Sequence, residues 1–328
     1  MLVGRDDQID ERLSGPLPAF GFTDEGYVLS PAGFGPDRRI VDPADIADLS
    51  TTVGESDGDN VRRPYSIVGD VLTYRRCKRQ YGFVREYNFE MSRATQLFYG
   101  KVVHETLDLA HQHYRGDIDD VEGGQVPTAT ELREYFDEVV TALREQRVLP
   151  VNQQAIETAF KHIRRFNERE GPELYPNVVD TERHLKHGAE DFRLEGVVDV
   201  LVDTDEDETQ VWDYKAGRRP DEDDDLLEDY REQLFVYAVL FREQNGYYPD
   251  RGVIYFINEE DRDQARFEVD FSEGVIEDAL VRFEDTVREI EATRDVDGWS
   301  DITEGADEAT CAECDFRWDC PAADYDDR

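Results

Sequence analysis

Lysine is nearly absent from this 328-residue chain, in which it occurs five times against 32 arginines and 78 acidic residues. The formal net charge at pH 7 is −41. Such an acidic, lysine-poor composition is typical of proteins that work at high ionic strength. Salt there limits the repulsion between like charges on the protein to a range of a few ångströms. A salt-adapted cytosol is therefore the interpretation that we favour, and an acidic protein from an ordinary cytosol is the alternative.

Long apolar runs are also missing. The opening stretch MLVGRDDQIDERLSG lacks the apolar core of a signal peptide, and no window approaches the roughly 20 apolar residues of a membrane span. These absences favour a soluble, cytoplasmic protein without a membrane partner. The phosphate-loop pattern G-x-x-x-x-G-K-[ST] does not occur, so an ATP-driven motor would have to be another chain.

Cysteine occurs only four times. Cys311, Cys314 and Cys320 form a C-x2-C-x5-C group, and Cys77 lies far upstream. In an intracellular protein such residues are more often metal ligands or reduced thiols than disulfides. Four thiolates suit either zinc or an iron–sulfur cluster, and a pair of disulfides is the remaining alternative.

Positive charge is concentrated in one window of this acidic chain. Residues 62–85, RRPYSIVGDVLTYRRCKRQYGFVR, carry seven cations and a single acid, Asp70. Tyr74, Tyr81 and Phe83 are interleaved with these cations. A solvated helix face would explain the pattern, but the window also predicts a surface that attracts phosphates and stacks on bases.

The chain divides into an extension and a larger domain. Residues 1–60 are rich in Gly, Pro and Asp, which predicts an acidic, largely irregular segment. Residues 61–328 are expected to form one mixed α/β domain. Periodicity predicts helices near 66–80, 95–114, 129–147, 152–169, 226–244 and 273–294, and strands near 180–187, 192–203, 209–215 and 252–257. This order predicts a mixed sheet flanked by helices.

The run VWDYK at 211–215 carries the main chemical signal. Asp213 and Lys215 are two residues apart on a strand and therefore point to one side of the sheet. Asp199 lies on the other arm of the predicted hairpin, after Gly196, where glycine would let another group approach closely. Two carboxylates and a lysine facing one point suit Mg²⁺ or Mn²⁺. Lysine can also exchange a proton with an attacking water, which arginine cannot.

A structural Asp213–Lys215 ion pair would explain D-x-K alone, but three further residues favour the functional interpretation. His104 lies in the predicted helix upstream of the sheet. Gln233 and Tyr237 share one face of the helix that follows the D-x-K strand, where they could contact phosphate or orient Lys215.

Taken in order, these residues resemble the RecB-like branch of the PD-(D/E)XK nuclease superfamily. The resemblance covers about residues 63–322, and it is nearest to the iron–sulfur members, namely the CRISPR-associated RecB-like exonucleases and the nuclease domains of AddB-type helicase–nucleases. It rests on Cys77, His104, Gly196–Asp199, Asp213–Lys215, Gln233–Tyr237 and the C-x2-C-x5-C group. The segment between His104 and Asp199 is longer than in the compact CRISPR-associated members.

The resemblance implies a restriction-endonuclease-like core and a set of site residues. It implies metal ligation by His104, Asp199, Asp213 and the carbonyl of Tyr214, with Lys215 as the catalytic lysine. Gln233 and Tyr237 would assist catalysis. A 4Fe–4S cluster would be held by the four cysteines, Cys77, Cys311, Cys314 and Cys320.

The function that the resemblance implies is DNA hydrolysis. We expect an exonuclease that acts on single strands or strand ends in DNA repair, recombination or CRISPR adaptation. This expectation allows two kinds of protein partner, a helicase or a CRISPR adaptation protein. A non-catalytic iron–sulfur DNA-binding or assembly subunit of a helicase–nuclease complex is the alternative.

Overall fold

The computed structural model describes residues 20–23, 26–29, 63–89, 95–150, 152–188, 192–204, 208–296, 298–317 and 320–321. The chain separates into two units, Met1–Val61 and Arg62–Arg328. In the first unit, β1 (Phe20–Thr23) and β2 (Gly26–Leu29) form an antiparallel pair. The rest of the extension predicted at 1–60 lies outside the described residues.

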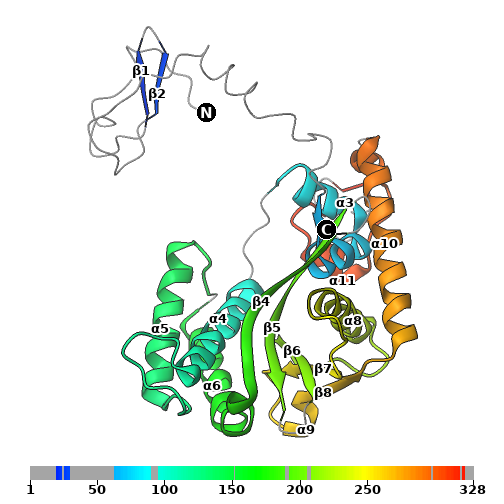
Figure 1. Ribbon diagram of the computed structural model, residues 1–328. Helices are drawn as coiled ribbons and strands as arrows, with labels where there is room; N and C mark the ends of the chain where they lie inside the picture. The colour runs from blue at the N-terminus through cyan, green and yellow to red at the C-terminus, as the bar shows by residue number, and fades with distance from the viewer. Residues whose placement is uncertain are drawn as a thin grey trace. The chain divides into compact units, whose positions relative to one another are not determined.

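The second unit is built on a six-stranded mixed sheet (Figure 1). Its strands are β3 (Pro64–Tyr65), β4 (Val178–Gly188), β5 (Arg193–Asp203), β6 (Thr209–Lys215), β7 (Arg251–Phe256) and β8 (Arg266–Asp270). The order is β3-β5-β6-β7-β8, and β4 pairs with β5. The pairs β4–β5, β5–β6 and β7–β8 are antiparallel, whereas β3–β5 and β6–β7 are parallel. The predicted hairpin and mixed sheet are confirmed, and β8 is a further strand that the sequence reading omitted.

Strand β5 changes partners along one of its edges. β3 pairs with Arg193 and Leu194, whereas β6 pairs with the segment from Val200 to Asp203. Among the described residues, no strand pairs with this edge between those two stretches, while β4 covers the other edge. The sheet is therefore split beside residues 195–199, and Asp199 lies at the split.

Helices cover both faces of the sheet, as Figure 1 shows. Alternate residues of β7 belong to different cores: Val253 and Tyr255 pack with helices α4–α6, and Ile254 and Phe256 pack with α8 and α10. The longer helices are α4 (Thr95–Arg115), α5 (Ala129–Glu145), α6 (Gln153–Arg169), α8 (Asp225–Asn245) and α10 (Glu273–Asp295). The shorter ones are α2 (Thr73–Arg76), α3 (Lys78–Tyr81), α7 (Gly171–Leu174), α9 (Arg262–Ala265) and α11 (Glu308–Glu313). Ile67–Leu72 and Gly82–Glu86 are π-helical, and Tyr175–Asn177 and Gly298–Asp301 are 3-10 helices.

Local signals explain where several helices begin and end. Thr128 and Glu131 form a reciprocal capping box at the start of α5, and Gly246 ends α8 in a left-handed conformation with φ of 85°. The single helix predicted over 66–80 is wrong in one respect. The chain becomes extended at Cys77, which separates α2 from α3, and the Cys77 sulfur accepts a hydrogen bond from the backbone N–H of Gln80.

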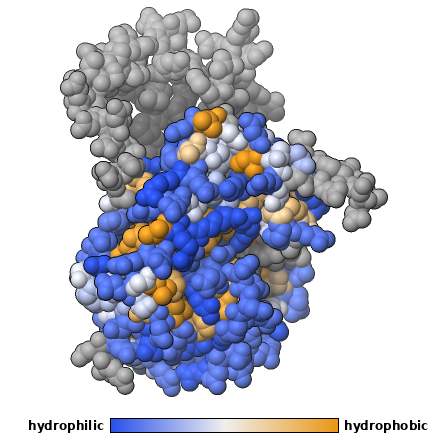
Figure 2. Space-filling view, turned by 90° about the vertical axis from the view of Figure 1, so that its right-hand side faces the viewer, coloured by the Kyte–Doolittle hydropathy of each residue, from blue (hydrophilic) through white to orange (hydrophobic). Residues whose placement is uncertain are grey.

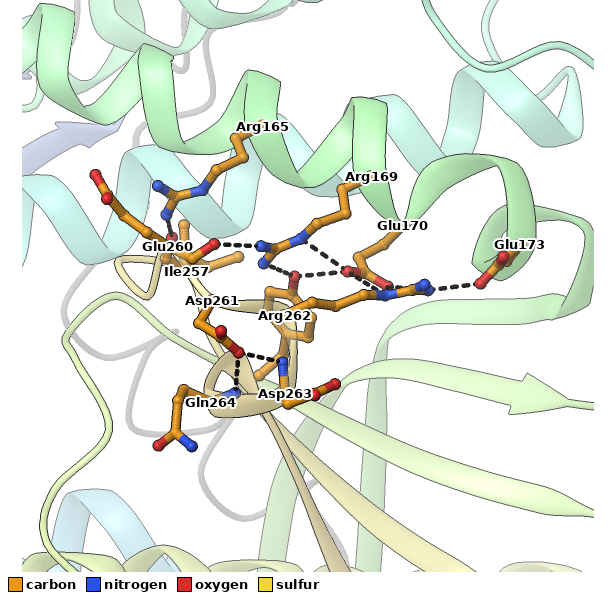
Figure 3. A network of polar contacts seen from close by, with 11 residues as sticks. Arg165, Arg169, Glu170, Glu173, Ile257, Glu260, Asp261, Arg262, Asp263 and Gln264 are labelled. Atoms are coloured by element: carbon orange, nitrogen blue, oxygen red, sulfur yellow. Dashed lines mark hydrogen bonds and ion pairs between the residues drawn. The ribbon is translucent and has the colours of Figure 1, made fainter.

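A buried polar network fixes the α4–α6 layer against the sheet (Figure 3). The carboxylate of Glu170, at the end of α6, accepts hydrogen bonds from the hydroxyl of Tyr255 on β7 and from Arg262 on α9, each at 2.9 Å. Arg169 donates to the carbonyl oxygen of Glu260 at 2.8 Å. A buried carboxylate is stable only when such partners satisfy it, so this network specifies how the helical layer docks.

The surface is strongly polar. Figure 2 shows one face of the molecule as mainly hydrophilic, with small and separate apolar patches. No helix in the described part of the chain is both long and apolar enough to cross a membrane.

Candidate active site

Three side chains from three different elements meet where the sheet splits. They are His104 of α4, Glu182 of β4 and Asp199 of β5, and their ligand atoms all lie within 4.8 Å of one another. Nδ1 of His104 is 3.2 Å from Oδ1 of Asp199. One imidazole and two carboxylates form a donor set that suits a divalent cation such as Mg²⁺ or Mn²⁺.

Glu182 is the site residue that the sequence reading missed. The pairing of Thr181 with Val200 and of Arg183 with Val198 places Glu182 opposite Asp199. Its φ of 48° is unusual for a residue other than glycine, and such backbone outliers cluster at functional sites. The signal that could have found Glu182 is the register of the predicted antiparallel pair, which no single segment reveals.

Asp199 is held in place by the neighbouring strand. Its Oδ2 accepts a hydrogen bond from the backbone N–H of Tyr214 at 2.6 Å. The Tyr214 hydroxyl lies 2.9 Å from Nε2 of His111, two turns after His104 on α4. Burial lowers the pKa of His111 to about 3, and Arg115 contributes in the same direction, so the ring remains neutral. These contacts fix α4 against β6 and so orient His104 toward Asp199.

A second group lies on the α8 face of β6. Nζ of Lys215 is 2.8 Å from Oδ2 of Asp213 and 2.7 Å from Oε1 of Gln233. The Gln233 amide nitrogen donates to Oδ1 of Asp213 at 2.6 Å and to the hydroxyl of Tyr237 at 2.8 Å. Lys215 also lies over the ring of Tyr230, 4.4 Å from its centre. The structure therefore joins all four predicted residues, Asp213, Lys215, Gln233 and Tyr237, in one hydrogen-bonded array.

The negative charge of Asp199 contributes to a raised pKa at three neighbouring groups, Glu182, Asp213 and His104. Burial raises the pKa of Asp213, Lys215 opposes this shift and the charge of Asp199 reinforces it. Burial and the charge of Asp199 raise the pKa of Glu182 to about 7. Burial alone would lower the pKa of His104, but Asp199, Asp213 and Glu182 raise it to about 9. A cluster of mutually repelling carboxylates is stabilised by a cation, which is how divalent metal sites are built.

Gly196 has the role expected of a glycine before Asp199. A Cβ at this position would lie 2.8 Å from Cε1 of Tyr237 and 3.1 Å from Cδ1 of Leu240. The absence of a side chain therefore lets α8 approach β5 closely, which brings Gln233 to Asp213.

The site opens into a cleft of about 650 Å³ between α4 and α5. His104 and Glu182 line it together with Lys101 and three acids, Glu105, Asp108 and Glu138. The candidate metal-binding group of His104, Glu182 and Asp199 is thus accessible from solvent on the α4–α5 side.

The basic window at 62–85 differs from its prediction. Tyr74 and Tyr81 are 2% and 0% exposed, because they pack edge-on against each other and beside Trp299. The prediction that Tyr81 stacks on bases is therefore wrong. Arg75 bonds to Glu232 at 2.8 Å. The other ion pairs of this window are Arg63–Glu86, Lys78–Glu289 and Arg85–Asp70. Four of the seven cations of this window therefore form ion pairs with acids of the same chain.

The four cysteines line a single small pocket between α3 and α11. The amide nitrogen of Gln80 lies 3.4 Å from the sulfur of Cys314. All four are free thiols, and burial raises the pKa of Cys77. Among the described residues, no three of these sulfur atoms lie within 4.8 Å of one another.

Comparison with known proteins gives one family match. Residues 68–321 match the family model described as the PD-(D/E)XK nuclease superfamily. No curated protein matches the sequence. Among solved structures, the chain is similar to the crystal structure of a “Putative exonuclease” from Eubacterium rectale, with 13% identity, a TM-score of 0.48 and coverage of 81% of this chain and 90% of the other. It is also similar to the crystal structure of SSO0001, with 19% identity, a TM-score of 0.32 and coverage of 66% and 96%.

Proposed function

Because the chain belongs to the PD-(D/E)XK nuclease superfamily, we propose that it is a metal-dependent exonuclease that hydrolyses phosphodiester bonds at single-stranded DNA ends. The observation that carries this proposal is the pair of adjoining groups at the split in the sheet. One group, His104, Glu182 and Asp199, offers ligands for a divalent cation. The other places Lys215 against Asp213 and Gln233.

The metal would be held by His104, Asp199, Asp213 and the carbonyl of Tyr214, to which the geometry adds Glu182. When bound, a divalent cation polarises a phosphoryl oxygen and lowers the pKa of its water. Gln233 orients the lysine, because its two amide hydrogens are used by Asp213 and Tyr237 and its oxygen therefore faces Lys215. Held there, Lys215 can exchange a proton with the water that attacks phosphorus.

The four cysteines would hold a 4Fe–4S cluster. Their common pocket supports a shared ligand. The C-x2-C-x5-C group with one distant cysteine is the pattern on which the resemblance to the iron–sulfur members rests, and this pattern favours a cluster over one zinc ion. Such a cluster would connect α3 to the segment around α11.

Residues 61–328 would form the nuclease domain, with residues 1–60 as an extension. Its pathway would be DNA repair, recombination or CRISPR adaptation, and a helicase or an adaptation protein would be the partner. The composition supports a salt-adapted host.

The test is a strand-degradation assay on anaerobically purified protein. A 5′-labelled single strand should be shortened in the presence of Mg²⁺ or Mn²⁺ and remain intact with a chelator. Asp213→Ala should remove this activity and keep the protein folded. A wild-type protein that binds the strand but does not shorten it with either metal would instead be the non-catalytic subunit that stands as the alternative.

A further inference from the structure

Three of the five lysines of this chain lie at the candidate site or in the two hollows beside it. Lys215 belongs to the catalytic array, Lys101 lines the α4–α5 cleft and Lys186 lines a second hollow beside β4. Of the other two, Lys78 pairs with Glu289, and Lys161 is exposed on α6. Lysine is a compact, mobile point charge that binds phosphate well. In a protein with so few lysines, a lysine near the candidate site is a candidate contact for a phosphate of the DNA strand.

The second hollow has a volume of about 450 Å³, which lies within the roughly 300–1,000 Å³ of ordinary ligand sites. It adjoins residues 195–199 of β5, which pair with β4 on one edge and with no described strand on the other, and Gly196 and Tyr237 lie in its wall. Lys186 and His184 of β4 and the exposed Val68 also line it. The hollow therefore adjoins the catalytic array through Tyr237, which bonds to Gln233.

Strand β4 connects this hollow to the metal-ligating group. Glu182 of this strand belongs to the candidate metal-binding group, and His184 and Lys186, further along the same strand, line the hollow. The side chains of His184 and Lys186 are exposed. Across the ladder, His184 pairs with Val197 and Lys186 with Glu195.

Charge distinguishes the hollow from the α4–α5 cleft. The cleft is lined by four carboxylates, those of Glu105, Asp108, Glu138 and Glu182, against Lys101 and His104. A phosphate next to the site would be repelled there. The hollow has Lys186 and His184 against one carboxylate, that of Glu195, which lies 3.5 Å from Arg193. Lys186 has no ion pair within the described part of the chain.

We infer that this hollow binds the nucleotide adjacent to the scissile phosphate. Lys186 and His184 contact its phosphate, and Val68 contacts its sugar or base. The inference rests on the proposed function and extends it, because it assigns the DNA strand a path along β4 and away from the acidic cleft.

Binding to DNA without cleavage tests this path. The affinity of a labelled oligothymidylate is measured at several KCl concentrations, with Ca²⁺ in place of Mg²⁺. Lys186→Gln should weaken binding at low salt and reduce the log–log salt slope by about 0.7, the value of one phosphate contact on a single strand. Lys161→Gln, which removes another exposed lysine, on α6, should leave both the affinity and the slope unchanged.

Neutral methylphosphonates locate the contact. A single methylphosphonate replaces one phosphate of the strand, first on one side of the scissile position and then on the other. At one of these two positions the replacement should weaken binding of the strand to the wild type and leave its binding to Lys186→Gln unchanged. If both proteins lose the same affinity at every position, or if Lys186→Gln keeps the wild-type salt slope, the inference is wrong although the nuclease assignment stands. A wild-type protein that neither binds nor degrades DNA would overturn both.

Discussion

Gly196 of β5 and Tyr237 of α8 are in direct contact, because a Cβ on residue 196 would lie 2.8 Å from Cε1 of the tyrosine ring. One turn earlier on α8, Gln233 bonds to Asp213. The closeness of helix and strand at Gly196 therefore positions the amide of Gln233 against Asp213.

Replacing Gly196 with Ala should damage the site by displacing α8. Overpacking of this kind costs about 1–3 kcal/mol of stability, and we expect a lower melting temperature together with slower strand degradation. Gly274→Ala is the matched control, since a Cβ there would meet nothing within 4 Å. If Gly196→Ala cleaves DNA at the wild-type rate, the close approach has no part in catalysis.

Lys215→Arg separates charge from proton transfer. The guanidinium keeps the ion pair with Asp213 but remains protonated. We expect cleavage to fall by about 10²–10⁴-fold, the range for loss of a general acid or base, with little change in melting temperature. Single-turnover rates at saturating enzyme measure this effect. Near-normal cleavage would show that Lys215 provides only positive charge.

Glu182→Gln tests the residue that the register places opposite Asp199. The change keeps the shape of the side chain and removes one carboxylate from the candidate metal-binding group. We expect the Mn²⁺ concentration needed for half-maximal cleavage to rise about 10–100-fold, the range for weakened metal-site partners. Glu277→Gln, which changes an exposed acid on α10, should leave the requirement unchanged. Equal Mn²⁺ titrations for wild type and Glu182→Gln would remove Glu182 from the site.

Cys77→Ala and Cys314→Ala test the cluster. Anaerobically purified wild type should be brown and contain about four irons per chain. Each variant should lose iron and unfold at a lower temperature, because metal binding and folding are coupled. Asp213→Ala should keep the colour, since the pocket of the cysteines is separate from the strand-borne site. Colourless protein with stoichiometric zinc would contradict the cluster assignment.

His162 should make stability depend on pH. Burial, together with Arg165 and Lys161, lowers its pKa from 6.5 to about 4. The folded protein therefore disfavours the protonated ring, so the stability that neutral His162 contributes is complete above pH 6.5 and is lost as the pH falls toward 4. Between these values the free energy of unfolding should fall more steeply for the wild type than for His162→Gln. Parallel curves from urea titrations would exclude this role.

Much of the fold could be predicted because its signals are local. The alternation around Asp199 and Asp213 fixes two strands, and the spacing of Gln233 and Tyr237 fixes one helix face. Glu182 was missed because its place depends on the pairing of two strands, and the burial of Tyr81 was missed because its partner, Trp299, is remote in sequence. Locally, a basic and aromatic window looks the same whether its rings face solvent or the core.

The pocket shared by Cys77 with Cys311, Cys314 and Cys320 has a consequence for how the protein is made. Roughly 230 residues separate its first thiol from its second, and ribosomes add about 5–20 residues per second. Cys77 therefore leaves the ribosome roughly ten to fifty seconds before the other three cysteines. A group bound by all four thiols could be inserted only after translation has passed Cys320, and its insertion would require the thiols to stay reduced in the interval.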